Sequence, residues 1–410
     1  MKYTLDQEDC YMNVTVDVIR PRKMGNNVLR VINGYAGTGK TSLLPYMANE
    51  FREKFSEVLV TAPTNKAVSV ILDKFNAFAK IHKPKYKIQF STLHSYIYGS
   101  PNKYGYFVPK DEKSSNIMIV VDESSMITKD VLNDLLKRAE NSYFLFVGDS
   151  FQLEPVGEDP RLFNDLYPTS RLSEVVRHDN GVLETATRLR SSKYAEVLLN
   201  DDVYEVRENK LISYYLDDYE TGKDIVYICS TNKKRVSMNN LFRSELGMRG
   251  DITTEPLICI NNNNHFSNGE IFRMVDPVKK RDIEVLLPGI DGLIKGAVYE
   301  DLERTILFVD GYEKPSLYSQ QFAKLPYMEK AEIFGHNNIE DKYFISKDVI
   351  ICSLGFAISA HKSQGSQFEN VFIDFDFCSP KWDARRWLYT AVTRATTEVN
   401  IVRSNNFKFV

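Results

Sequence analysis

The residues best suited to chemistry form one glycine-rich run: Gly34, Tyr35, Ala36, Gly37, Thr38, Gly39, Lys40 and Thr41. The run fits the pattern GxxxxGK[ST], and it follows an apolar stretch and precedes a helical one, which is the context that this phosphate-binding loop requires. Glycines let backbone N–H groups converge on phosphate oxygens, and a helix N-terminus adds partial positive charge. We expect Lys40 to reach the β- and γ-phosphates of ATP and Thr41 to ligate Mg²⁺. Pro45 could kink the helix that follows.

Two adjacent carboxylates, Asp122 and Glu123, follow the apolar run 117–121. A run that does not alternate with polar residues is typical of a strand buried on both faces of a parallel sheet. Open α/β sheets bind ligands beside the carboxyl ends of their strands, so both carboxylates are expected beside the phosphate loop. Asp122 is placed to hold Mg²⁺, directly or through water, and Glu123 to orient or deprotonate the attacking water.

Gln152 follows the next predicted strand, in the segment 148–153. Its amide can both donate and accept hydrogen bonds, which suits a sensor of the γ-phosphate. On local sequence alone, a plain turn after a strand explains this segment equally well.

These residues must be positioned by a sheet. Short apolar runs in the first half of the chain alternate with segments of helical length such as 129–139, which is typical of βαβ units around a parallel sheet. The predicted strands are 28–32, 58–60, 117–121 and 143–147. A second α/β unit is expected later, with a helix at 382–394. Its predicted strands are 224–229, 371–373 and 399–402.

Two stretches lack this alternation and are interpreted as insertions into the α/β cores. Residues 87–115 hold many Tyr, Lys, Gly and Pro residues, and residues 104–108 could form one arm of a short β-hairpin. Residues 256–345 are rich in β-type runs, turns and charge. The second insertion is therefore predicted to be β-rich, and an SH3-like fold is one candidate for it.

Composition narrows the class of protein. The formal net charge of -3 argues against a protein that coats nucleic acid by bulk charge, although a local groove needs only a few donors. The five cysteines form no CxxC pair, which disfavours a zinc site or a disulfide framework. No apolar run approaches the ~20 residues that a membrane-spanning helix needs, and the first residues show no signal segment. A cytoplasmic protein, in the host cytoplasm if phage-encoded, is expected.

An ordered set of segments resembles the superfamily 1 helicases, most closely the RecD/Dda type of bacteria and phages. In chain order the segments are GYAGTGKT from Gly34, TAPTNKAV from Thr61, STLHS from Ser91, VVDESSM from Val120, VGDSFQLEPV from Val147, LSEVVRH from Leu172, ISAHKSQGSQF from Ile358 and YTAVTRA from Tyr389. Only the first is specific by itself, whereas the ordered set is highly specific. The resemblance covers nearly the whole chain.

The resemblance implies two RecA-like motor domains that bind ATP between them. The first would comprise 1–86 and 116–175, and the second 176–255 and 346–410, with 87–115 and 256–345 as their insertions.

Two arginines are carried over by position from the resembling helicases. Arg177 and Arg394 correspond to arginines of the second motor domain that contact the γ-phosphate. Delocalised cations of this kind suit phosphoryl transfer. Without the motif context, each would be interpreted as a surface arginine in a salt bridge.

The resemblance also assigns nucleic-acid contacts. They fall on Pro63, Thr64, Asn65, Thr92, His94, Ser359, His361 and Lys362. Short hydroxyl, amide and imidazole groups at loop tips suit phosphate contacts that ignore sequence. A histidine satisfied within the core is the ordinary alternative for His94 and for His361.

Three further contacts are implied less directly. Asn232, at the end of a predicted strand, could also touch the bound strand, and Asn268-Gly269-Glu270 resembles a short turn in the second insertion of these helicases. The first insertion carries an aromatic pin in the resembling helicases, and Phe107 is the candidate here. Packing of the insertion's aromatic residues against the motor core explains most of them equally well.

The sequence departs from the family near its start. Resembling helicases carry an adenine-reading Gln a few residues after an N-terminal Leu, and here the run is Leu5-Asp6-Gln7-Glu8-Asp9. Gln7 is nearer to Leu5 than usual and Asp9 is near the usual place, which puts adenine selectivity in doubt. The short N-terminus also predicts no additional nuclease or protein-binding domain.

These features predict an ATP- and Mg²⁺-dependent DNA helicase that unwinds duplex in replication or recombination. Movement from 5′ to 3′ is expected from the resemblance alone. Expected partners are single-stranded and fork DNA, with replication or single-strand-binding proteins as candidates and no membrane, and the protein is expected to be monomeric. An RNA helicase of the same superfamily and a nucleotide-switched binding protein that does not translocate are the alternatives.

Overall fold

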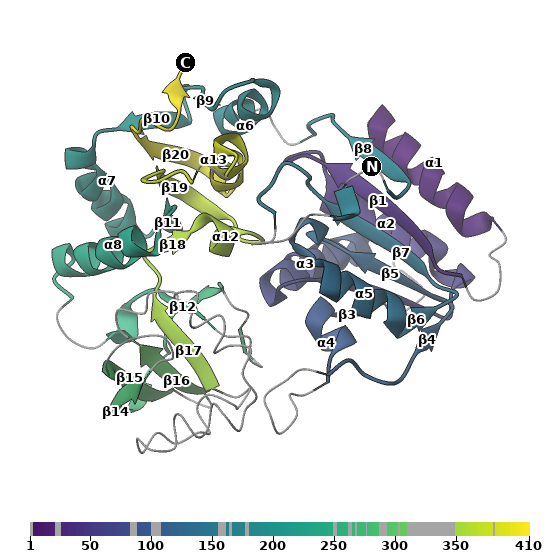
Figure 1. The fold of residues 1–410 in the computed structure, drawn as a ribbon, viewed down its shortest axis with the longest axis horizontal. Helices are drawn as coiled ribbons and strands as arrows, with labels where there is room; N and C mark the ends of the chain where they lie inside the picture. The colour runs from purple at the N-terminus through teal and green to yellow at the C-terminus, as the bar shows by residue number, and fades with distance from the viewer. Residues whose placement is uncertain are drawn as a thin grey trace. The chain divides into compact units, whose positions relative to one another are not determined.

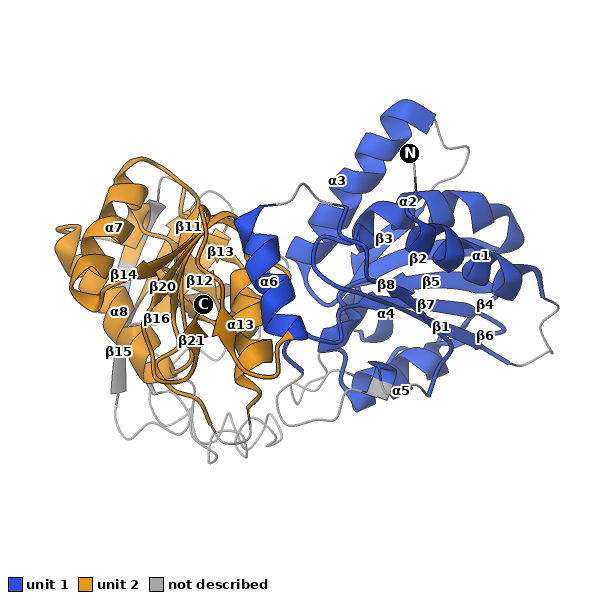
Figure 2. Cartoon of the chain, turned by 90° about the horizontal axis from the view of Figure 1, so that it is seen from above, with its two compact units in different colours: residues 1–100, 108–191 blue, residues 101–107, 192–410 orange. Residues whose placement is uncertain are grey.

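A computed structural model divides the chain into two compact units (Figures 1 and 2). The first comprises residues 1–100 and 108–191, and the second contains residues 192–410. The structure describes residues 3–20, 26–82, 88–99, 108–154, 161–163, 166–176, 180–248, 252–260, 265–266, 269–275, 277–286, 293–301, 304–309, 349–379 and 382–410. Each unit is built on a parallel sheet, so the predicted α/β class is confirmed.

The first unit contains a six-stranded sheet in the order β3-β2-β5-β7-β1-β8, and every pairing in it is parallel. Its strands are β1 Val28–Gly34, β2 Glu57–Ala62, β3 Gln89–Thr92, β5 Ile117–Val121, β7 Tyr143–Gly148 and β8 Thr169–Leu172. Every residue of β5 and β7 is buried, as the unbroken apolar runs predict. These two strands form the centre of the unit, and their carboxyl ends carry the predicted acidic and glutamine segments.

Helices cover both faces of this sheet. α1, α2 and α3 share one apolar core with the sheet, and α4 and α5 share a second core on the opposite face. The helices are α1 Leu5–Ile19, α2 Lys40–Phe51, α3 Asn65–His82, α4 Leu93–Ile97, α5 Lys129–Arg138 and α6 Gly181–Ser191. Short 3-10 turns lie at η1 Arg52–Lys54, η2 Ser124–Met126 and η3 Arg161–Phe163, and β4 Ser114–Ser115 pairs with β6 Ala139–Glu140. α2 continues through Pro45 without ending there.

The second unit contains a five-stranded parallel sheet in the order β10-β20-β19-β11-β18. Its strands are β10 Val203–Val206, β11 Ile225–Cys229, β18 Ala357–Ser359, β19 Phe368–Asp374 and β20 Ala395–Val402. Its helices are α7 Glu208–Glu220, α8 Asn232–Glu245, α12 Ala360–Ser363 and α13 Ala384–Val392, with the turn η4 Ile252–Thr254 and the small pair β9 Glu196–Val197 and β21 Lys408–Phe409. The strands and the helix predicted for this half are therefore confirmed.

A second sheet in the same unit forms the β-rich insertion. Its strand order is β13-β12-β17-β16-β15-β14, and only β16 and β17 run parallel. The strands are β12 Leu257–Cys259, β13 Ile271–Phe272, β14 Pro277–Leu286, β15 Leu293–Asp301, β16 Arg304–Val309 and β17 Val349–Leu354. The sheet thus extends past the expected limit at 345, and its apolar residues share one core with α7, α8 and β11.

The two compact units divide at 191/192, whereas the sequence division was drawn at 175/176. The difference arises because the segment after β8 and helix α6 pack on the glycine-rich loop of the first unit. The backbone N–H of Val176 donates to the Gly37 carbonyl (2.9 Å), and the Arg190 guanidinium lies 3.6 Å from the centre of the Tyr35 ring.

Candidate nucleotide site and nucleic-acid surfaces

Strand β1 ends in the glycine-rich loop, and α2 begins directly after it. Gly37 and Gly39 have φ values of +79° and +76°, a backbone conformation that other L-residues rarely adopt. A Cβ atom at Gly39 would also lie 2.8 Å from the Gln7 amide nitrogen and 2.9 Å from Val176. Both conformation and close packing therefore require glycine at this position.

The loop places Lys40 and Thr41 beside the acidic end of β5. The Lys40 Nζ donates to the carbonyls of Gly34 (2.5 Å) and Tyr35 (2.9 Å). The Thr41 hydroxyl donates to Asp122 Oδ2 (2.9 Å). A hydroxyl and a carboxylate held next to each other provide the hard oxygen ligands that Mg²⁺ prefers, so these two residues fit such an ion.

Asp122 is buried, and burial raises its pKa to about 6. The nearby Glu123 charge contributes to this rise, and the Glu123 N–H, the Thr41 hydroxyl and the Lys40 charge oppose it, so the value of about 6 is the net result of all these causes. The protein groups around Asp122 therefore do not fully stabilise its negative charge. A bound divalent cation would provide the missing positive charge.

Glu123 has a left-handed backbone conformation with φ of 50°, which is rare for a residue with a side chain. Its Oε2 is buried and has no hydrogen-bond partner among the residues that the structure describes. Buried polar atoms are normally paired, so an unpaired carboxylate oxygen beside Asp122 is free to accept a proton from water.

Gln152 lies at the same sheet edge, after β7. It is 4% exposed, and its Oε1 has no hydrogen-bond partner within the described part of the chain. The loop that carries it is tied to β1, because Asn33 Nδ2 donates to the Ser150 hydroxyl (2.9 Å) and the Ser150 N–H donates back to Asn33 (3.1 Å). The structure therefore brings Gln152 to the strand ends that also hold Lys40 and Glu123.

Arg177 lies outside the described residues, but the segment before it is fixed from two sides. Val176 is bonded to the glycine-rich loop, and the Asp6 carboxylate accepts hydrogen bonds from the Ser173 N–H (2.7 Å), the Ser173 hydroxyl (2.6 Å) and the Glu174 N–H (3.1 Å). The Ser173 hydroxyl is the main cause that lowers the pKa of Asp6. Local sequence gave no signal for this role of Asp6.

Arg394 belongs to the second unit and is 5% exposed. Its guanidinium donates to the Thr390 carbonyl (3.0 Å), the Ser366 carbonyl (3.2 Å) and the Thr393 hydroxyl (3.2 Å). Arg394 is therefore a buried residue that bonds to the end of α13 and to the segment before β19. It is not the surface arginine that local sequence alone would suggest.

Gln7, in the first turn of α1, is buried against the glycine-rich loop. It is 1% exposed and its Nε2 donates to the Thr38 carbonyl of the glycine-rich loop (3.0 Å), whereas Asp9 is exposed. Counting from Leu5 put Asp9 in the place of the family glutamine. Thr4 and Gln7 form a capping box at the start of α1, which fixes Gln7 at the third position of the helix.

The predicted nucleic-acid contacts of the first unit come together at one edge. Pro63, Thr64 and Asn65 follow β2, while Thr92 ends β3 and His94 follows it; the two strands pair with Ala62 opposite Thr92. The Thr64 hydroxyl accepts from the Ala67 N–H (3.2 Å), and the Thr92 hydroxyl accepts from the Ser95 N–H (3.2 Å), so both also cap helices. The His94 ring lies 4.6 Å from the Tyr98 ring.

The second unit shows the same arrangement. Asn232 follows β11 and Ser359 ends β18, and these strands pair with Cys229 opposite Ser359. His361 and Lys362 lie in α12, directly after Ser359. Gly269 of the insertion approaches this segment, because a Cβ atom there would lie 3.0 Å from the Lys362 carbonyl. Asn268 lies outside the described residues.

The first insertion is described only at its base. The Gly99 N–H donates to the Val108 carbonyl (3.1 Å) and the Lys110 N–H to the Ile97 carbonyl (2.9 Å), so the two ends run antiparallel. Tyr98 donates to Asp134 (2.8 Å), which makes it part of the motor core. Tyr96 likewise bonds to Ser114 (3.2 Å). Tyr104, Tyr106 and Phe107 lie outside the described residues.

Asp122→Asn is expected to raise thermal stability. A carboxyl whose pKa is raised on folding is destabilising when ionised, so its contribution to stability falls as pH rises through about 6. Without Mg²⁺ and nucleotide at pH 7.5, the Tm of the variant should exceed that of the wild type by about 2–4 °C or more. The gain should shrink as pH falls toward 5, and the exposed Asp130→Asn should change nothing. A variant that is less stable at every pH would show that Asp122 is compensated within the protein.

Within the described residues, no helix is long and apolar enough to cross a membrane.

Residues 18–208 match the family model of an AAA domain, and residues 354–402 match that of a UvrD-like helicase C-terminal domain. The first match contains the nucleotide site, and the second contains Ser359, His361, Lys362 and Arg394.

Among curated relatives, the uncharacterised protein MJ1519 of Methanocaldococcus jannaschii is 24% identical over 93% of this chain, which spans only 37% of that protein's length. The RecBCD subunit RecD of Buchnera aphidicola is 21% identical, with 97% of this chain and 75% of RecD covered. A Bacteroides Pif1 helicase in complex with ADP-AlF3 and single-stranded DNA shares the fold, with a TM-score of 0.50 and 17% identity over 98% of this chain and 93% of that one. Together with the ordered motifs and the nucleotide site, the two family-model matches and the RecD relative support a superfamily 1 helicase of the RecD/Pif1 type, and the Bacteroides Pif1 structure shows the same fold.

Proposed function

We propose that the chain hydrolyses ATP to move from 5′ to 3′ along single-stranded DNA and to unwind duplex in replication or recombination. The observation that carries this proposal is the arrangement of polar loops in each unit. In both units, the predicted contact residues follow two neighbouring parallel strands, and in the first unit the same sheet edge holds the nucleotide site. A movement caused by ATP binding or hydrolysis can therefore be transmitted to the residues that contact DNA, because both sets of residues lie on one rigid sheet.

At the nucleotide site, each side chain has a distinct task. Lys40 would exchange its two loop carbonyls for phosphate oxygens, while Thr41 and Asp122 would hold Mg²⁺, which when bound neutralises phosphate charge. Glu123 orients the attacking water and accepts its proton at the unpaired Oε2. Gln152 senses the γ-phosphate by donating from its amide N–H groups, while its unpaired amide oxygen can accept from the attacking water.

Arg177 and Arg394 are proposed to stabilise the charge that develops on the γ-phosphate. Gln7, which already contacts the glycine-rich loop, keeps one amide hydrogen and one lone pair for the nucleobase. We therefore propose that Gln7 contributes to adenine recognition, although it lies nearer to Leu5 than the glutamine of the resembling helicases.

The contact loops would bind phosphates of the nucleic-acid strand, and phosphate contacts distinguish the deoxyribose of DNA from the ribose of RNA only poorly. The Bacteroides Pif1 structure contains single-stranded DNA, which supports DNA as the substrate here. ATPase stimulation by poly-dT should exceed that by poly-U. The reverse order would favour the RNA helicase.

ATP-driven displacement of streptavidin from biotinylated DNA tests movement itself. A 5′-to-3′ motor should displace streptavidin from a 3′-terminal biotin and spare a 5′-terminal one. ATP hydrolysis without any displacement would instead support a nucleotide-switched binding protein.

Phe107→Ala is expected to abolish unwinding while DNA-stimulated ATPase stays within about twofold of wild type. The antiparallel ends at 97–99 and 108–110 suit a hairpin that would carry Phe107. An aromatic tip that stacks on an exposed base pair offsets part of the unstacking free energy, about 1–3 kcal/mol per base. Fork unwinding and ATPase should be measured side by side, with the exposed Tyr194→Ala as control. Equal loss of both activities, or of neither, would exclude Phe107 as the pin.

A further inference from the structure

Two large aromatic side chains are exposed beside the carboxyl edge of the second unit's parallel sheet. Phe377 is 50% exposed and Trp382 is 37% exposed. Their ring centres lie 6.1 Å apart at an interplanar angle of 76°, which is an edge-to-face pair. Single exposed apolar residues are common on protein surfaces. Two exposed aromatic rings that pack against each other are a candidate contact surface.

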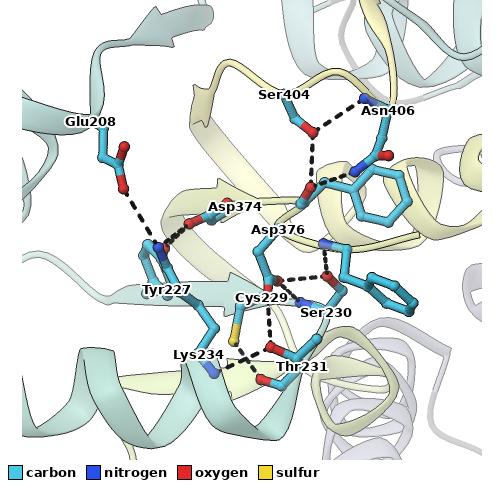
Figure 3. Close-up of polar contacts among 12 residues, drawn as sticks. Glu208, Tyr227, Cys229, Ser230, Thr231, Lys234, Asp374, Asp376, Ser404 and Asn406 are labelled. Carbon is cyan, nitrogen blue, oxygen red and sulfur yellow. Dashed lines mark hydrogen bonds and ion pairs between the residues drawn. The ribbon is translucent and has the colours of Figure 1, made fainter. Parts of the chain in front are cut away.

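The backbone that carries Phe377 is held by a polar network around Asp376. Its carboxylate accepts hydrogen bonds from the Ser230 N–H (2.9 Å), the Ser230 hydroxyl (2.6 Å) and the Thr231 hydroxyl (2.5 Å), as Figure 3 shows. The Phe377 N–H in turn donates to the Ser230 hydroxyl (2.9 Å). The segment after β19 is therefore bonded to the segment after β11, which leads directly into Asn232.

A second, buried network fixes the base of this surface. Asp374, at the end of β19, accepts from the Tyr227 hydroxyl (2.6 Å) and pairs with Lys234 of α8 (2.9 Å) (Figure 3). Thr231 caps the same helix, because its hydroxyl accepts from the Lys234 N–H (3.2 Å). The loop before α8 and the segment that carries Phe377 are thus held in one arrangement, so little further ordering is needed when a ligand binds.

We infer that Phe377 and Trp382 form a stacking surface for a base of the single strand that passes Asn232. This inference rests on the proposed function, because it assumes that a nucleic-acid strand follows the carboxyl edge of this sheet.

Three observations favour a base as the occupant. The Asp376 carboxylate beside Phe377 repels phosphate and so favours the neutral part of a nucleotide. Two rings offer far less area than the roughly 800 Å² per partner that a stable protein interface needs, but they suit a single base. The segment that carries Phe377 is also bonded to Ser230, two residues before Asn232, and Asn232 and Ser359 lie at the ends of the neighbouring strands β11 and β18.

Tryptophan fluorescence reports on this surface directly. The chain has two tryptophans, and Trp387 is 1% exposed, so quenching by a bound base arises at Trp382. An oligo-dT should quench the emission of the wild type. A strand of the same length whose central nucleotides lack bases should bind and quench little. Trp382→Phe should lose the quenching signal, which assigns that signal to Trp382.

Phe377→Ala should weaken oligo-dT binding about tenfold, as expected for one lost stacking contact, and should leave binding of the base-free strand within about twofold. Tyr214→Ala removes a similarly exposed ring from α7 (48% exposed) and should change neither affinity. Affinities can be measured by anisotropy of labelled strands, which does not depend on Trp382.

The outcomes separate the inference from the proposed function. If the wild type binds oligo-dT and Phe377→Ala binds both strands as well as the wild type, the stacking surface is excluded while the helicase proposal stands. Equal weakening for both strands would also overturn the inference, because it would indicate a structural defect. If the wild type binds neither strand, the proposed function fails and the inference fails with it.

Discussion

Glu123→Gln is expected to bind ATP with nearly wild-type affinity and to hydrolyse it about a thousandfold more slowly. The substitution keeps the size of the side chain and the left-handed backbone at this position, but the amide cannot accept a proton from water. General-base catalysis typically contributes about 10²–10⁴-fold, and Oε2 of Glu123 is the unpaired buried oxygen placed to supply it.

Binding and chemistry can be separated for this variant. Calorimetry with a non-hydrolysable ATP analogue gives the affinity, and single-turnover hydrolysis with poly-dT gives the rate. Glu220→Gln, an exposed glutamate at the end of α7, serves as the matched control and should behave as wild type. If Glu123→Gln loses nucleotide affinity instead of rate, the carboxylate has a binding role and the proton acceptor lies elsewhere.

Lys40→Ala should reduce ATP hydrolysis about a thousandfold or more and, unlike Glu123→Gln, should also weaken nucleotide binding. The ammonium group supplies positive charge at the β- and γ-phosphates in both the ground state and the transition state. The fold should survive, because within the described residues the hydrogen bonds of Nζ go to two carbonyls of the loop itself.

Circular dichroism and thermal unfolding should show a folded Lys40→Ala variant before its turnover is compared. The exposed Lys74→Ala on α3 controls for the loss of a lysine. A folded Lys40→Ala protein with near wild-type turnover would refute the assignment of the glycine-rich loop as the phosphate site.

The strands that could be predicted from the sequence are the buried ones that consist of an unbroken run of apolar residues. β5 and β7 are buried along their whole length and are predicted with nearly correct bounds. β3 and β8 were missed because Gln89–Thr92 and Thr169–Leu172 are short, largely polar edge strands. β3 forms because it pairs with β2, and β8 forms because it pairs with β1. Neither sequence is apolar enough to predict a strand by itself.

The candidate site shows the same division between local and distant information. The glycine-rich loop is a contiguous motif, so its residues could be named from the sequence. Thr64 and Thr92 lie close together because β2 pairs with β3, and this pairing cannot be predicted from the local sequence. The bonds of Asp376 to Ser230 join residues 146 positions apart, and no local signal marks them.

Motor activity with defined direction is tested most directly by unwinding two duplexes that differ only in whether the single-stranded tail is 5′ or 3′. With ATP and Mg²⁺, the wild type should unwind the 5′-tailed duplex and leave the 3′-tailed duplex intact, and Glu123→Gln should unwind neither. Unwinding of the 3′-tailed duplex alone, or equal strand separation without ATP, would contradict a 5′-to-3′ helicase driven by hydrolysis at this site.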